Sequence, residues 1–103
     1  MVVAPLTFNT LNAWAHGLAG TYPITTLCAA LGARTPSVAV PFANHDLAGH
    51  PAWPGSLAVL RGAGVKVVDP QDGSTSTLEP VASGTGYRVS EAFEWEWVLR
   101  QFV

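Results

Sequence analysis

Two short stretches combine prolines with amide, hydroxyl and imidazole side chains, which are groups that bind small polar ligands. The first stretch spans residues 4–10 and reads Ala-Pro-Leu-Thr-Phe-Asn-Thr. The second stretch spans residues 41–51 and reads Pro-Phe-Ala-Asn-His-Asp-Leu-Ala-Gly-His-Pro. Each follows an apolar run typical of a buried strand and precedes apolar residues at helical spacing. Because open α/β sheets bind ligands where their strands end, the two stretches are predicted to form two walls of one pocket.

Several of these side chains could orient a bound ligand. The amide of Asn44 can donate to a carboxylate and accept from an amine without carrying a charge. Thr7, Asn9 and Thr10, near the start of a helix, offer hydroxyls, an amide and free backbone N–H groups. The structural alternative is that Asn9 caps the helix and that Asn44 stabilises a turn.

Two histidines, His45 and His50, are candidates for acid–base catalysis because of their imidazole side chains. Asp46 could position either imidazole, although an Asp in a turn is usually exposed. A His before a Pro, such as His50, more often simply caps or braces the loop. No single residue is therefore assigned as catalytic.

The composition excludes several classes of function. The 103 residues are 49% hydrophobic and only 12% charged, against a usual charged share of about 25%. This predicts that another chain or further sequence covers part of the apolar surface, the alternative being an unusually apolar monomer. The net charge is −2 and the basic residues are scattered singly, so neither nucleic acid nor a membrane is expected as a partner. No apolar run approaches the roughly 20 residues that span a bilayer.

Cysteine and histidine usage sets further limits. Cys28 is the only cysteine, which excludes a disulfide framework and predicts a cytoplasmic location. The three histidines and this cysteine lack the spacing of metal ligands, so no metal site is predicted. Cys28 lies within an apolar helical stripe and is expected to be an inert part of the core.

The order of apolar patterns predicts strands and helices in alternation. Apolar runs indicate strands, and helical spacing followed by Gly indicates helices. Residues 70–89 are rich in Gly, Ser, Thr and Pro, which indicates an irregular loop with an optional short strand at 75–78. The other expected elements are strands at 2–4, 37–40 and 65–68, a helix from Thr7 or Asn9 to the glycines at 17 and 20, and helices at 21–31, 51–63 and 90–102.

This order is that of a parallel sheet with helical crossovers. The predicted fold class is therefore α/β, a three-layer αβα arrangement with helices on both faces of the sheet. Three parallel strands make a thin sheet, and half of a flavodoxin- or Rossmann-like parallel sheet has this appearance. Residues 1–103 are accordingly expected to be the C-terminal portion of such a domain.

The two stretches together resemble the motifs of a flavoprotein family, the FMN-dependent cysteine decarboxylases. This family includes phosphopantothenoylcysteine decarboxylase and the enzymes that oxidatively decarboxylate the C-terminal cysteine of lantibiotic precursors. The first stretch is similar to the family's proline–Ser/Ala–Asn–Thr motif. The second is similar to its Pro-x-Met-Asn-x-x-Met-Trp-x-His-Pro motif. The resemblance covers about residues 2–70, and the pair of motifs in matching order and separation is fairly specific.

The resemblance implies a flavoprotein that binds FMN and a small-molecule or peptide substrate. Within the second motif the Asn, here Asn44, holds the substrate carboxylate. The implied chemistry is the flavin's, which takes a hydride equivalent from a thiol-bearing carbon before carbon dioxide is lost. The implied cofactor-binding residues are Pro5, Leu6, Thr7, Phe8, Asn9 and Thr10, and the implied substrate-binding residues are Ala43, Asn44 and His45.

The sequence departs from the family's pattern in three places. The family's phosphate-binding loop and catalytic His belong to an N-terminal half that has no counterpart here. Ala43 and Leu47-Ala48 stand where the family has Met and Met–Trp, and no Cys follows residue 70. We therefore expect a different substrate, and a chain that acts as a homo-oligomer or with a separately encoded N-terminal half.

Other functions stay open on the sequence alone. If active, the chain would be a flavin-dependent oxidative decarboxylase or a related oxidoreductase. A second possibility is a catalytically inactive, truncated remnant or interaction module with the same fold. A third is a flavodoxin-like domain that binds a small acidic or nucleotide ligand without flavin.

Overall fold

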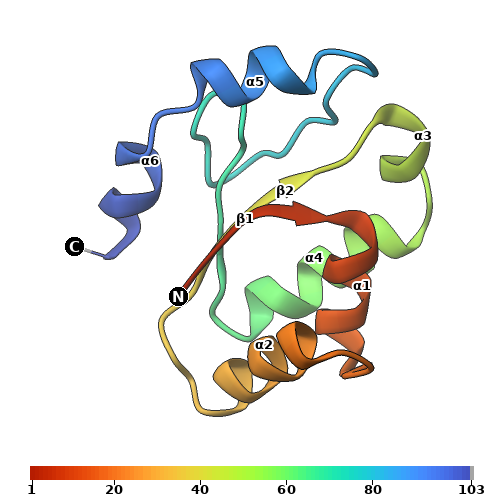
Figure 1. Cartoon of the computed structure of the whole chain (residues 1–103), viewed down its shortest axis with the longest axis vertical. Helices are drawn as coiled ribbons and strands as arrows, with labels where there is room; N and C mark the ends of the chain where they lie inside the picture. Colours follow the sequence, from red (N-terminus) through yellow and green to blue (C-terminus); the bar gives the residue numbers. More distant parts are fainter. Residues whose placement is uncertain (103) are drawn as a thin grey trace.

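The computed structural model describes residues 1–102 and alternates strands with helices along the chain (Figure 1). No helix within these residues is long and apolar enough to cross a membrane. The elements are β1 (Val2–Thr7), α1 (Phe8–His16), α2 (Tyr22–Gly32), β2 (Val38–Phe42), α3 (His45–Ala48), α4 (Ala52–Gly62), β3 (Lys66–Val67), α5 (Gly86–Ala92), α6 (Glu96–Leu99) and the 3₁₀ helix η1 (Arg100–Phe102).

The three strands form one parallel sheet in the order β1-β2-β3. Val2 lies beside Val38 and Thr7 beside Phe42, with a register irregularity between Val3 and Leu6. Both connections between neighbouring strands run through helices, as parallel pairing requires. The predicted α/β fold with a parallel, flavodoxin- or Rossmann-like sheet is confirmed.

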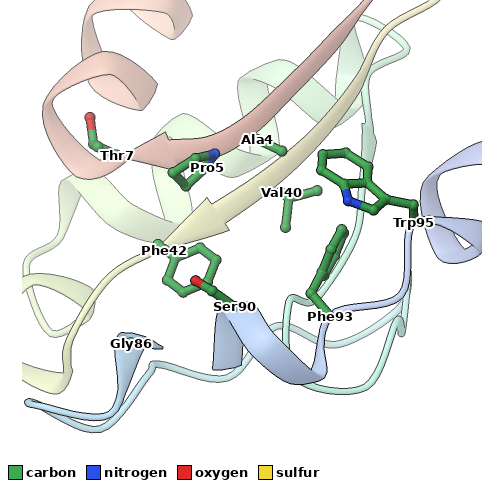
Figure 2. A pocket seen from close by; sticks show the side chains of 9 residues that line it. All are labelled: Ala4, Pro5, Thr7, Val40, Phe42, Gly86, Ser90, Phe93 and Trp95. Atoms are coloured by element: carbon green, nitrogen blue, oxygen red, sulfur yellow. The ribbon is translucent and has the colours of Figure 1, made fainter. Parts of the chain in front are cut away.

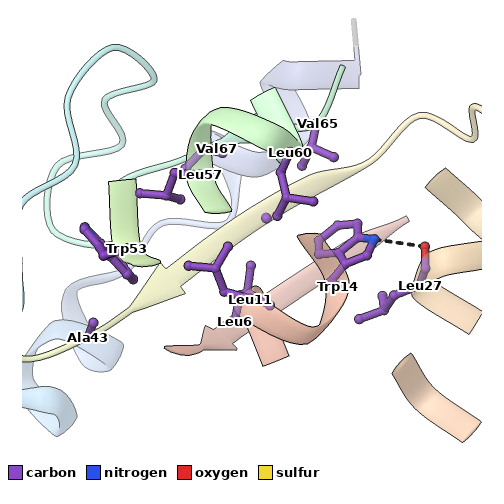
Figure 3. Packing of buried hydrophobic residues seen from close by; sticks show 11 residues of the cluster. Leu6, Leu11, Trp14, Leu27, Ala43, Trp53, Leu57, Leu60, Val65 and Val67 are labelled. Atoms are coloured by element: carbon purple, nitrogen blue, oxygen red, sulfur yellow. Dashed lines mark hydrogen bonds between the residues drawn. The ribbon is translucent and has the colours of Figure 1, made fainter. Parts of the chain in front are cut away.

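The larger core lies between the sheet and the layer formed by α1, α2 and α4 (Figure 3). The indole Nε1 of Trp14, on α1, donates to the backbone oxygen of Leu27 on α2 at 3.0 Å. The buried hydroxyl of Ser56, on α4, donates to the Asn12 side chain on α1 at 2.7 Å. The helix layer is therefore joined by polar bonds as well as by apolar packing of its buried members, which are Leu6, Leu11, Trp14, Leu27, Ala39, Ala43, Trp53, Leu57, Leu60, Val65 and Val67.

The opposite face of the sheet is covered by the C-terminal segment. Figure 1 shows α5 and α6 on the side away from α1, α2 and α4. Val98 of α6 is buried against the valines of β2, and Phe93 and Trp97 pack at the edge of this second core. Gly73 has a φ of +76° and lies so close to the Trp97 ring that a Cβ would come within 2.6 Å of it. The third layer is thus present but thinner than the first.

The first stretch forms a strand end and a helix start with no loop between them. β1 continues through Pro5 to Thr7, beyond the strand expected at 2–4, and α1 begins at Phe8. Thr7 is the N-cap, and its side chain accepts a hydrogen bond from the backbone N–H of Thr10 at 3.4 Å. Of the two caps that the sequence allowed, the structure has Thr7, which places Asn9 inside the first helical turn.

The expectation of one continuous helix over residues 90–102 is wrong. α5 ends at Ala92, Phe93 has an extended backbone, and a separate α6 and η1 follow. In one helix Trp95 would face away from Phe93 and Trp97, because residues two positions apart lie on opposite sides. The break lets both indoles pack edge-on against Phe93, with ring centroids at 5.2 and 5.4 Å.

The loop before α5 is irregular, as predicted, but it ends at Thr85 because α5 begins at Gly86. No strand forms at 75–78 within the described sheet. Hydroxyl groups there bond locally, with the Ser74 side chain accepting from the backbone of Ser76 and Thr77. The sequence also failed to indicate the short α3, which has one turn and few apolar residues.

Candidate functional site

A pocket of about 400 Å³ lies where β1 and β2 end, at the carboxyl edge of the sheet. We call it the edge pocket. Both sequence stretches contribute to it, as predicted for the ends of neighbouring parallel strands. Its lining residues are Thr7, Phe8, Phe42, Ala43, Asn44, Leu47, Val81, Ala82, Ser83, Gly84 and Gly86.

The first wall is the junction of β1 and α1. The Thr7 hydroxyl donates to the Thr10 hydroxyl at 3.1 Å, so these two side chains hold each other at the helix start. Phe8 stacks on Trp53 with ring centroids 6.4 Å apart and meets the ring of His50 edge-on at 5.8 Å. The His-Pro end of the second stretch therefore braces the aromatic side chain of the first.

The second wall is the junction of β2 and α3. Asn44 is the N-cap of α3, and its Oδ1 accepts from the backbone N–H of Leu47 at 2.9 Å. The cap leaves the Nδ2 group as the donor that a ligand could use. Ala43 is buried beside it. The structural and the ligand-binding interpretations of Asn44 are therefore compatible, because they use different atoms of one amide.

The third wall is formed by residues 81–86, and the sequence did not indicate that they would line a pocket. Val81 is buried, and its N–H donates to the backbone oxygen of Ala43 at 2.7 Å, which attaches this segment to the end of β2. The residues that follow are small and polar, so their composition indicated only a surface loop. Their contact with the site comes from tertiary structure, for which the sequence holds no periodic signal.

A second, apolar pocket of about 310 Å³ adjoins the edge pocket on the α5 side of the sheet (Figure 2). We call it the face pocket. The two pockets share Thr7, Phe42 and Gly86. Figure 2 shows Phe93 and Trp95 facing the sheet residue Val40 across this space. The remaining lining residues are Ala4, Pro5 and Ser90.

The other residues implied by the resemblance lie at varied distances from these pockets. Pro5 lines the face pocket, whereas the Leu6 side chain is 0% exposed and supports the site from inside the core. Asn9 and His45 are exposed on the first turns of their helices and line neither pocket. Thr7, Phe8, Ala43 and Asn44 are thus the implied residues that meet in the edge pocket.

Comparison with known protein families identifies the chain. Residues 1–87 match the model of the family described as Flavoprotein, and this range includes all three strands and every lining residue of the edge pocket. The chain belongs to the flavoprotein family. Membership implies a flavin cofactor. No curated protein and no solved structure matches the chain.

The lining that residues 1–102 give the edge pocket fits the ring of a flavin, but it contains no cationic side chain for a flavin phosphate. Phe8 and Phe42 offer apolar surface for a flat ring, while Thr7 and Asn44 offer polar groups to the edge of that ring. Among the described residues, no Lys or Arg lines either pocket. The site therefore suits an isoalloxazine ring, but it offers no cationic side chain to a phosphate.

Proposed function

We propose that this flavoprotein binds FMN in the edge pocket and is related to decarboxylases that act on cysteine-containing substrates. The observation that carries the proposal is that Thr7 and Phe8 meet Ala43 and Asn44 in one pocket at the carboxyl edge of the sheet. These residues belong to the two motifs that resemble the FMN and substrate sites of the cysteine decarboxylases.

The chain's own residues would bind the flavin ring and orient the substrate beside it. Phe8, fixed between Trp53 and His50, gives a rigid apolar wall that excludes water from one side of the ring. Asn44 would direct its free Nδ2 group at the substrate carboxylate while its Oδ1 remains in the helix cap. FMN, when bound, supplies a two-electron acceptor for a carbon next to a thiol.

The site would be completed by other chains, either further copies or a separately encoded N-terminal half. Within residues 1–102, β1 lies at an edge of the sheet, and one of its sides has no neighbouring strand. Trp95, at the adjoining face pocket, is 58% exposed. A partner at this edge would cover apolar surface and could supply the phosphate-binding groups.

The test is an FMN titration followed by flavin fluorescence and absorbance. Phe8→Leu keeps an apolar side chain but removes the stacked ring, so FMN affinity should fall about five- to tenfold. Tyr87→Leu is the matched control, because Tyr87 is an exposed aromatic residue that lines neither pocket. Equal affinities of the wild type and Phe8→Leu would contradict the placement of the flavin.

A second candidate is a non-catalytic flavin-binding module, and one observation favours it. The described lining of the edge pocket contains no Asp, Glu, His, Lys, Cys or Tyr, so it offers no side chain that exchanges a proton near neutral pH. Incubation of the flavin-loaded chain with a cysteine-terminated peptide, followed by mass spectrometry, separates the two. Loss of carbon dioxide from the peptide supports the enzyme, and an unchanged peptide supports the module.

A further inference from the structure

Asp69 is a buried carboxylate outside both pockets that follows the short strand β3. Only 1% of this residue is exposed. Its backbone closes a turn, because its N–H donates to the oxygen of Ser74 at 2.8 Å and its oxygen accepts from the N–H of Gly73 at 2.9 Å. A carboxylate buried this deeply is retained only where hydrogen bonds replace its lost hydration.

The two carboxylate oxygens of Asp69 bind opposite ends of the loop that follows. Oδ1 accepts from the N–H of Gln71 at 2.7 Å, and Oδ2 accepts from the N–H of Glu79 at 2.9 Å. The Gln71 side chain adds a second connection, since its Nε2 lies 3.3 Å from the backbone oxygens of Glu79 and Pro80. One side chain thus closes a loop from residue 71 to residue 79.

The loop closed by Asp69 continues along the chain into the third wall of the edge pocket. Glu79 is two residues before Val81, whose N–H binds the oxygen of Ala43 at the end of β2. The chain from 79 to 81 is therefore held at both ends, once by the Asp69 carboxylate and once by the sheet. Residues 82–84, which line the edge pocket, continue from that anchored segment.

We propose that Asp69 is a positioning residue that sets the third wall of the edge pocket against Ala43 and Asn44. It acts through residues 79–81 and touches neither the pocket nor its ligand. The part of this proposal that concerns ligand affinity rests on the proposed function. The part that concerns the position of the wall stands on the hydrogen bonds alone.

The substitution Asp69→Asn removes one of the two acceptor oxygens of the carboxylate while it keeps the size and shape of the side chain. An amide has one acceptor oxygen and one donor nitrogen, so it can accept from only one of the two N–H groups. The other N–H, of Gln71 or Glu79, then faces a donor and loses its partner. The loop should open at that point while the size of the buried side chain is conserved.

Hydrogen exchange and FMN titration on the whole chain test whether Asp69 positions the third wall. In Asp69→Asn, amide exchange at Glu79 and Val81, whose N–H groups are hydrogen-bonded, should accelerate at least about tenfold, while exchange in α1 and α4 stays near the wild-type rate. The Kd for FMN should rise about tenfold or more. Asp72→Asn is the matched control, because this exposed carboxylate accepts from Ser74 in the same loop without reaching the pocket wall.

Each outcome decides one part of the proposal. Unchanged exchange at Glu79 and Val81, or an equal change in the Asp72→Asn control, would overturn the role of Asp69. Faster exchange at Glu79 and Val81 in a chain whose wild type takes up no FMN would support the role of Asp69 and refute the proposed function. Should Asp69→Asn not fold, hydrogen exchange of the wild type decides: the amides of Gln71 and Glu79 should be protected because they donate to the Asp69 carboxylate, and exchange as fast as in the exposed residues 82–84 would overturn its role.

Discussion

Asn44 serves the fold with one atom and can serve a ligand with another. Its Oδ1 caps α3, and its Nδ2 remains available at the edge pocket. This division explains why neither the turn interpretation nor the binding interpretation of this residue excludes the other. It also allows a substitution that changes the second role while the first is kept.

Asn44→Asp should weaken the binding of a substrate carboxylate. Asp is as good an N-cap as Asn, so α3 keeps its cap. The donor is replaced by a negative charge that repels a carboxylate, and affinity for a cysteine-terminated peptide should fall at least about tenfold. The measurement is a peptide titration monitored by the absorbance of bound flavin. Asp46→Asn, an exposed change on the same helix, should leave the affinity within about twofold of the wild type.

Gly73 is needed for both its backbone angle and its lack of a side chain. Its φ is +76°, and a Cβ would meet the Trp97 ring at 2.6 Å. Gly73→Ala should therefore lower the free energy of unfolding by about 2–4 kcal/mol, the sum of left-handed strain and overpacking. Urea unfolding provides the measurement.

Gly84 separates these two contributions. Its φ is +80°, but a Cβ there meets nothing within 4 Å. Gly84→Ala should cost only the backbone strain, about 1–2 kcal/mol. Equal losses at the two glycines would show that the close approach to Trp97 adds nothing.

At the scale of elements, the sequence predicted those strands and helices that are marked by a regular pattern of apolar residues. Apolar runs located all three strands, and helical spacing located α1, α2 and α4 to within a few residues. These patterns work because each element buries one face against the same core. The meeting of the two stretches in one pocket followed from parallel topology, since the ends of such strands share one edge of the sheet.

What the sequence did not predict depends on contacts between distant residues. The break at Phe93 arises because two indoles pack on one phenyl ring, which spacing along one helix cannot express. The wall at 81–86 is placed by Asp69 and by the oxygen of Ala43. Both features lie in segments whose local composition suggested something else, a continuous helix in one case and a loose loop in the other.

Phe93 connects α5 and α6 to the sheet, and its removal should loosen that layer. The residue is half-buried and contacts both Trp95 and Trp97. Phe93→Ala should lower the free energy of unfolding by about 2–3 kcal/mol, below the full core value because the ring is partly exposed. Tryptophan fluorescence should also shift to longer wavelength as the indoles become more hydrated.

Tyr87→Ala provides the comparison within the same segment. Tyr87 is an exposed aromatic residue on α5, so its loss should change the unfolding free energy by no more than about 0.5 kcal/mol. A similar small change for Phe93→Ala would mean that the C-terminal helices are held to the sheet by Val98 and Trp97 alone.

The whole molecule is compact although its sheet is small. The radius of gyration is 12.9 Å, close to the value of about 13 Å for a domain of 100 residues. The two cores on opposite faces of the sheet account for this compactness. We therefore propose to measure ligand binding first on the chain by itself, so that a partner's contribution appears as a difference in affinity.

A partner's contribution to affinity should be largest for the phosphate of FMN. No Lys or Arg among the described residues lines the edge pocket or the face pocket, so the phosphate gains no ion pair with a cationic side chain there. We therefore predict that FMN and riboflavin, which share the isoalloxazine ring, bind to the chain alone with affinities within about threefold of each other. Parallel fluorescence titrations at fixed ionic strength measure the two constants.

The same titrations, repeated with a flavoprotein N-terminal half present, show where the phosphate is held. If a second chain supplies its partners, FMN should gain at least about tenfold over riboflavin in the mixture, because one such bond to a charged group is worth about 1.5–3 kcal/mol. An FMN preference already that large in the chain alone would place the phosphate partners among residues 1–103. Such a result would remove the need for a separately encoded N-terminal half, since copies of this chain would then hold the whole nucleotide by themselves.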